Sequence, residues 1–149
     1  MRAVPPQSLR PGTVVTVQMN GLFKLAHHFA LVSDKTGPDG MPMVIANSGE
    51  TRGPGEVSWS EFVKGREYRA FYPSALPPKT VLTNAYSMFG TRYDFLHWNC
   101  EHFANACHGR PAQSHQLDPH FRGSRKGFAA QRPYRFYPSY AQWQKSAHS

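Results

Sequence analysis

The chain has 149 residues, enough for one domain with an ordinary hydrophobic core. No run approaches the about 20 apolar residues that a membrane-spanning helix needs, and residues 1–12 lack the apolar segment of a secretory signal. We therefore expect a cytoplasmic location, with signal-independent export left open. The formal net charge of +8 favours anionic partners such as nucleic acid, acidic lipid surfaces or anionic polymers.

The N-terminal half predicts short strands separated by turns. We expect strands at residues 13–19, 27–33 and 41–48. The first is rich in β-branched side chains and lies between a Pro-Gly and an Asn-Gly pair, which are turn signals. Residues 34–40 between the other two contain Gly and Pro and predict a tight turn. The second and third strands are therefore expected to form a hairpin.

The following segment mixes helix and strand signals. Residues 49–55 predict a loop, and residues 58–65 a capped helical turn with Ser and Glu three residues apart. Residues 66–72 alternate as a strand does. A helix is expected at residues 79–89, where apolar side chains recur at helical spacing after two prolines.

A thiol lies at the start of the last predicted helix. Cys100 directly follows Asn99, a favoured N-cap residue, and Gly109 ends the segment. The free N–H groups and partial positive charge of a helix N-terminus lower a thiol pKa and can bind an oxyanion. Cys100 is therefore a candidate nucleophile, with a small buried structural residue as the alternative. Cys107 lies roughly 10 Å along the same helix, too far for a disulfide.

A nucleophilic cysteine needs a base within hydrogen-bond reach. Side chains alternate along the strand at 27–33, so His28 and His27 point to opposite faces. We choose His28, which shares its face with small and apolar residues, and keep His27 as the second choice. A core histidine that binds only backbone is the alternative for His28. His102 projects to another side of the helix from Cys100, and we expect it to be structural.

A third polar group should orient the imidazole. Asn47 on the neighbouring strand can do this, and Ser48 is the alternative because only one of the two can face the cleft. The cysteines show no Cys-x2-Cys pair, so neither a metal nor another cofactor is expected.

Several motifs together resemble one family. They are the Asn-Cys-Glu-His-Phe-Ala segment at 99–104, the Pro-Gly-then-strand at 11–15, the His-Phe-Ala-Leu-Val strand at 28–32, Tyr93 seven residues before the cysteine, and Gly109 with Ser114 and Gln116. In type and order these resemble the lecithin:retinol acyltransferase-like proteins, which include the H-Ras-like suppressor phospholipase/acyltransferases and many bacterial members.

The resemblance implies an α+β protein with a circularly permuted papain-like (NlpC-type) fold, in which a small antiparallel sheet packs against the cysteine helix. The resembling motifs cover roughly residues 9–116 and the composition shifts after Asp118, so we expect a catalytic domain at residues 1–118 followed by a basic aromatic tail at 119–149. The resemblance also implies a thioester on Cys100, with His28 as base and then acid, and Tyr93 near the oxyanion.

The sequence departs from the family pattern at one catalytic position. Many members carry a second histidine after a Val-Ile pair, whereas here Val44-Ile45 is followed by Ala46 and Asn47. We expect Asn47 to take the place of that histidine from the adjacent position.

The function expected from these residues is that of a thiol hydrolase or acyltransferase. Its substrate would be an acyl ester or amide, either a lipid acyl chain or a peptide or isopeptide; a deubiquitinase-like peptidase and a cell-wall amidase are variants. The alternative is a catalytically silent basic module that binds nucleic acid or another polyanion. In such a module, Arg and aromatic residues would bind single-stranded nucleic acid by charge and stacking, and the loss of the usual third histidine favours it. If the protein is an enzyme, the tail after Asp118, which has Arg, Lys and aromatic residues and no acidic one, would instead contact substrate or an anionic surface.

Overall fold

The computed structural model describes residues 4–18 and 27–111. In chain order the elements are η1 (Pro6–Ser8), β1 (Val14–Gln18), β2 (His27–Thr36), β3 (Pro42–Ser48), β4 (Gly53–Val57), α1 (Trp59–Val63), β5 (Tyr68–Phe71), α2 (Pro78–Ser87) and α3 (Cys100–Cys107). The described chain is thus an α+β protein, in agreement with the class expected from sequence. No helix in these two ranges is long and apolar enough to cross a membrane.

All five strands form one antiparallel sheet in the order β4-β3-β2-β1-β5. The predicted hairpin between β2 and β3 is confirmed, with Leu31 opposite Ile45. On the other side of β2, Gln18 of β1 pairs with His27. Strand β2 therefore lies between β1 and β3, and the pairing of its N-terminal end with β1 fixes the face to which each of its histidines points.

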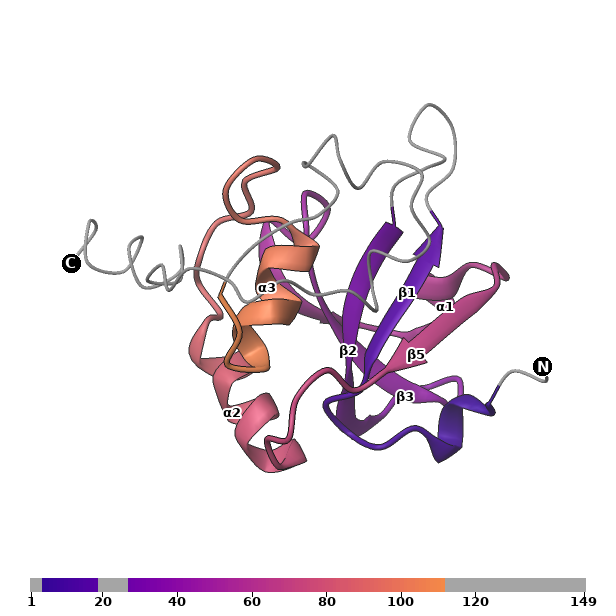
Figure 1. Cartoon of the computed structure of the whole chain (residues 1–149). Helices are drawn as coiled ribbons and strands as arrows, with labels where there is room; N and C mark the ends of the chain where they lie inside the picture. Colours follow the sequence, from indigo (N-terminus) through magenta and orange to yellow (C-terminus); the bar gives the residue numbers. More distant parts are fainter. Residues whose placement is uncertain (1–3, 19–26, 112–149) are drawn as a thin grey trace.

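The two faces of the sheet carry separate cores. One face packs against α2 and α3, and its cluster includes Phe29, Leu31 and Ile45 from the strands. The opposite face packs against α1 through Ala30 and its neighbours on the other strands. Figure 1 shows α2 and α3 together on one side of the sheet. Each strand thus buries alternate residues in two different environments.

Most predicted elements are confirmed to within a few residues. The exceptions are β2, which runs to Thr36, and β4, which forms an edge strand where a loop was expected at 49–55. The sequence does not predict β4 because it begins with Gly53 and Pro54, and both residue types are rare in strands. The tail at 119–149, and with it the boundary expected at residue 118, lies outside the described residues.

Gly53 is required by a close approach of two backbones. Its φ is 139°, and a Cβ at this position would lie 2.1 Å from the carbonyl oxygen of Thr91. The hydroxyl of Thr91 in turn accepts a 2.9 Å hydrogen bond from the indole of Trp98, two residues before Cys100. The start of β4 therefore supports the segment that leads into α3.

We expect Gly53→Ala to lower the free energy of unfolding by about 3 kcal/mol, because the methyl group forces two backbones apart. Gly40→Ala is the matched control: φ is 76° there and no atom lies within 4 Å of the added Cβ. The control should cost only the backbone strain of about 1 kcal/mol. Urea unfolding measures both variants, and equal losses would contradict the close approach.

Candidate active site

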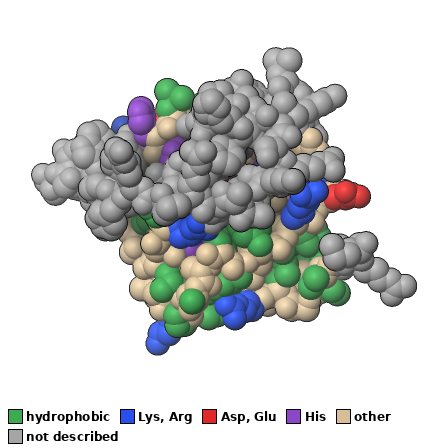
Figure 2. Space-filling model, viewed as in Figure 1, with side chains coloured by type: hydrophobic (Ala, Val, Ile, Leu, Met, Phe, Trp, Pro, Cys, Tyr) green, Lys and Arg blue, Asp and Glu red, His purple; other side chains and the backbone are tan. Residues whose placement is uncertain are grey.

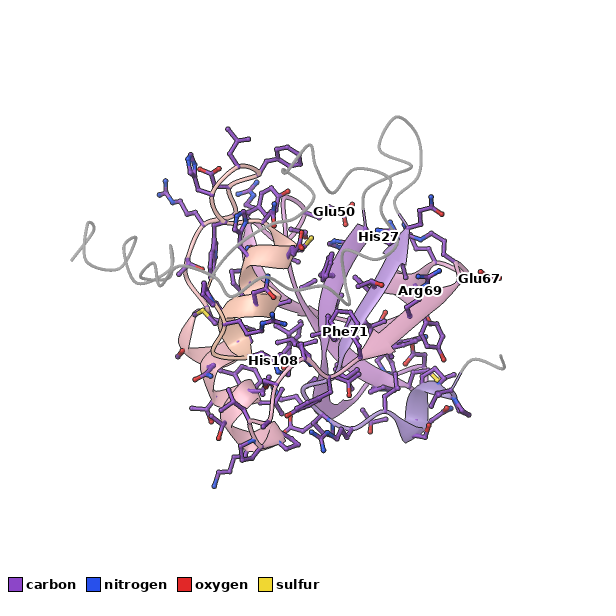
Figure 3. The ribbon with its side chains drawn as sticks, in the orientation of Figure 1. His27, Glu50, Glu67, Arg69, Phe71 and His108 are labelled. Carbon is purple, nitrogen blue, oxygen red and sulfur yellow. The ribbon has the colours of Figure 1, made fainter. Side chains whose placement is uncertain are left out.

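The Cys100 thiol lies between the first turn of α3 and the N-terminal end of β2. Its Sγ is 3.9 Å from the carbonyl oxygen of His27, a long contact in which the thiol is the donor. The side chain is buried but retains 7% exposure. Figure 3 shows His27 at the end of β2 nearest the first turn of α3. The predicted nucleophile is thus a buried member of the core cluster between the sheet and α3.

A capping box of two side chains holds this end of α3. The Asn99 Oδ1 accepts hydrogen bonds from the backbone N–H groups of Glu101 at 3.0 Å and His102 at 3.2 Å. The His102 Nδ1 accepts the Asn99 N–H at 2.9 Å, which closes a capping box. The structural role expected for His102 is confirmed. Since Nδ1 is an acceptor, a neutral His102 carries its proton on Nε2.

Burial and the helix end act on the thiol in opposite directions. Burial raises the pKa of Cys100 to about 12, and the Glu101 carboxylate adds to this increase. Hydrogen bonding by the backbone N–H groups of Phe29, Glu101 and Cys100 lowers the same pKa. The resting thiol is therefore protonated at neutral pH. A thiol in this state would need a base in order to react, and the same N–H groups would then stabilise the thiolate.

His27, and not His28, shares a face of the sheet with Cys100. His28 points into the other core, where its ring lies 4.9 Å from that of Phe62. Burial lowers the pKa of His28 to about 4, as is usual for an enclosed neutral imidazole. This placement corrects the sequence-based choice of His28 as the residue that faces the thiol. Strand alternation sets the two histidines apart, but only the packing of α1 and α3 shows which face each one occupies.

Two charged side chains shift the pKa of His27 in opposite directions. Burial lowers its pKa, the Arg69 guanidinium lowers it further, and the Glu101 carboxylate raises it. Arg69 is exposed on β5, opposite Thr16 of β1, so its side chain projects on the α3 face of the sheet. Glu101 is buried beside the nucleophile. Sequence reasoning missed both residues: the adjacency of Glu101 to Cys100 was a signal for one, and Arg69 had none before the strand register was known.

Asn47 also faces α3 and is fully buried. Its Nδ2 donates to the carbonyl oxygens of Trp98 at 2.8 Å and Asn99 at 3.1 Å. These two acceptors fix the orientation of the amide, and its Oδ1 then has no hydrogen-bond partner within the described part of the chain. Ser48 instead bonds Thr51 in the next turn, at 2.9 Å. Of the two residues left open by the sequence, Asn47 is the one that reaches the site.

Tyr93 lies near the thiol as well. Burial raises the pKa of its phenol, and Cys100 contributes to the shift, so the two side chains are close enough to interact electrostatically. Gly49, in the turn after β3, lies against the ring: a Cβ there would be 3.9 Å from it. Ser114 and Gln116, which contributed to the family resemblance, lie outside the described residues.

The assembled site contains a thiol, an imidazole, a buried amide with an unused acceptor, and a phenol. No group of three or more His, Cys, Asp or Glu side chains in the described ranges could hold a metal ion. Comparisons of the chain with protein-family models, with curated proteins and with solved structures find no match. Functional inference therefore rests on the residues of the site.

The His102 cap predicts a specific loss of stability in acid. Burial lowers the pKa of His102 from 6.5 to about 4, so the unfolded chain binds one more proton than the folded chain between these values. The stabilisation is complete above pH 6.5 and is lost as pH falls towards 4. His102→Gln keeps an acceptor for the Asn99 N–H but cannot titrate. Between pH 4 and 6.5 we expect this variant to show a smaller slope of unfolding free energy against pH. The difference in slope should correspond to the binding of about one proton.

His102→Ala separates the cap from the charge. It should show the same shallower slope as His102→Gln. Because the cap is missing, its free energy of unfolding should be lower than that of His102→Gln at every pH, by about 1 kcal/mol. A slope equal to that of the unmodified chain in both variants would contradict a buried neutral His102.

Proposed function

We propose that the protein is a cysteine-dependent acyl hydrolase or acyltransferase with Cys100 as nucleophile and His27 as base. The observation that carries the proposal is the thiol at the capped N-terminus of α3, in contact with the strand residue that also supplies an imidazole on the same face. Such a pairing of thiol, base and free backbone N–H groups is the minimum that thiol-mediated acyl transfer requires.

In the proposed reaction His27 takes the thiol proton as Sγ attacks the acyl carbonyl carbon. The carbonyl π electrons move to oxygen, and the Cys100 N–H and the Tyr93 hydroxyl are the candidate donors to that oxyanion. When the bond to the leaving alcohol or amine breaks, His27 returns the proton to the leaving group. Water or an acceptor nucleophile then attacks the thioester and frees the thiol.

Asn47 is the proposed positioning residue for the base. Its Nδ2 is occupied by the two carbonyl groups before the nucleophile, so its unused Oδ1 can accept a hydrogen bond only from another donor. An imidazolium N–H of His27 fits this requirement, since both side chains project on the α3 face. Asn47 would thereby hold the base and the nucleophile segment in one framework.

The order of the elements agrees with a permuted papain-like arrangement, because the histidine strand β2 precedes the cysteine helix α3. Together with the segment at 99–104, this order supports the proposal of a lecithin:retinol acyltransferase-like protein. If His27 is the base, that resemblance needs one adjustment, since the family strand motif aligns its histidine with His28.

A matched pair of histidine variants tests the assignment. We would incubate the full chain with activated acyl esters of short and long chain length, a phosphatidylcholine and a peptide amide, and read acyl adducts by intact mass. Cys100→Ala should abolish the adduct, whereas Cys107→Ala should retain it. His27→Gln should slow acylation about a hundredfold or more, and His28→Gln should not.

Three outcomes would contradict the proposal. One is an adduct that survives Cys100→Ala, and another is equal rates for the two histidine variants. The third is the absence of any adduct, combined with salt-sensitive binding to polyanions, which would support the silent basic module instead.

The charges around His27 predict the pH dependence of the reaction. A base must be neutral to act, and the pKa of His27 lies below its ordinary value of 6.5. The acid limb of kcat/KM should therefore lie below pH 6.5. Arg69→Met removes a cation that lowers this pKa and should move the limb to higher pH. Lys79→Met, which removes an exposed cation from α2, should leave it in place.

A further inference from the structure

An exposed arginine lies on the face of the sheet that carries the candidate site. Arg69 belongs to the edge strand β5, where it pairs with Thr16 of β1, and Thr16 in turn pairs with Phe29 of β2. Paired residues project on the same face, and Phe29 belongs to the core beneath α3. His27 is two residues from Phe29 along β2 and shares that face. Arg69 and the candidate base therefore lie on one side of the sheet.

Within the described ranges, the guanidinium of Arg69 forms neither an ion pair nor a hydrogen bond. Glu67, the acidic residue nearest to it in sequence, is also exposed and forms no ion pair with it. In Figure 2 a basic and an acidic side chain are exposed at the right, where Figure 3 labels Arg69 and Glu67 in the same view. The N–H donors of Arg69 are therefore available to a molecule that reaches this face.

The charge of Arg69 acts against the candidate base while no anion is bound. Of the charged groups in the described chain, Arg69 and Glu101 shift the pKa of His27, and Glu101 is buried. The Arg69 cation opposes protonation of His27, although the proposed reaction requires His27 to take up the thiol proton. An anion paired with Arg69 would cancel this effect. The position of Arg69 is therefore unfavourable for an empty site and favourable for one that holds an anionic substrate.

Protection of the sheet edge does not account for the face on which Arg69 lies. A cation on an edge strand discourages pairing with other chains, but it does so from either face, because the exposed backbone is common to both. Tyr68 and Ala70 alternate with Arg69 in β5 and pair with residues of the opposite core. A cation at either of these positions would protect the edge without opposing protonation of His27.

We propose that Arg69 binds a carboxylate of the substrate, so that the site selects acyl groups that carry a second, anionic carboxyl group at their far end. This inference rests on the proposed function and names its substrate class. The planar guanidinium presents paired N–H donors that match the two oxygens of a carboxylate. Strand β5 is two strand spacings, about 10 Å, from β2, and the arginine side chain spans part of that distance. The bound carboxylate would thus lie several bonds from the carbonyl carbon that Cys100 attacks.

The kinetic test compares nitrophenyl esters of adipic and suberic acid, each with one free carboxylate, with esters of the matching monoamides, which are neutral and of nearly the same shape. At about pH 8 His27 is neutral with or without Arg69. We expect kcat/KM to be about tenfold higher for the acid esters. Arg69→Met should remove this preference and leave the amide esters unchanged, which also shows that the variant is folded. Arg69→Glu should instead favour an aminohexanoyl ester, whose far end is a cation. Lys79→Met, which removes an exposed cation from α2, should keep the preference for the acid esters.

The pH dependence gives a second readout of the same pairing. The acid limb of kcat reports the base in the substrate complex, and that of kcat/KM reports the base in the free enzyme. With the acid esters the limb of kcat should lie at higher pH, because a paired Arg69 no longer lowers the pKa of His27. With the amide esters, and with either ester in Arg69→Met, the two limbs should coincide. The Glu101 carboxylate acts on His27 in every case and leaves this comparison unchanged.

Binding without reaction separates the carboxylate site from the proposed chemistry. In the full chain with Cys100→Ala, N-butyl adipamic acid should bind about tenfold more tightly than its neutral amide in an NMR titration, and adding Arg69→Met should remove the difference. Equal affinities for the two compounds, or an acid-ester preference that survives Arg69→Met, would overturn the role of Arg69. If no ester acylated the unmodified chain while Arg69-dependent binding persisted, the proposed chemistry would fail and the carboxylate site would stand.

Discussion

The candidate site depends on the hydrogen bonds that fix the N-terminus of α3. Asn99 caps the helix, His102 closes the capping box, and Asn47 reaches from β3 to bond the two carbonyl groups before the thiol. Each of these groups satisfies buried backbone atoms that would otherwise cost about 1–3 kcal/mol apiece. The same bonds set the position of Sγ against β2. The stability of this end of α3 and the position of the Cys100 thiol therefore have one physical origin.

The thiol illustrates how burial and helix-end electrostatics oppose each other. Enclosure in the core raises the pKa of Cys100, while the N–H groups around it lower that pKa, and burial prevails in the resting state. A protonated thiol is less easily oxidised than a thiolate, and it becomes nucleophilic only when a base accepts its proton. An imidazole of lowered pKa suits that task, because it stays neutral in mild acid.

Strand β2 contributes side chains to the cores on both faces of the sheet. One histidine at its N-terminal end lies toward α3 and the other packs on Phe62 beside α1, although the two are adjacent in sequence. The loop before α3 similarly combines two roles, since its Trp98 is fully buried under the helix while Phe95 and Leu96 are exposed at the tip. A short turn stabilised by Asp94 allows both, because it reverses the chain within a few residues.

The sequence by itself determined most of the elements and the position of the candidate nucleophile. Pro-Gly and Asn-Gly pairs, β-branched runs and the Asn99 cap are local signals, and they predicted four of the five strands, the helices and the place of Cys100 at a helix start. Tertiary structure decided which of His27 and His28 shares a face of the sheet with the thiol, that Asn47 and not Ser48 reaches α3, and that Arg69 acts on His27 from β5. The physical reason is the twofold alternation of strands: it separates neighbours onto opposite faces, but only the helices that pack on each face determine what those faces meet.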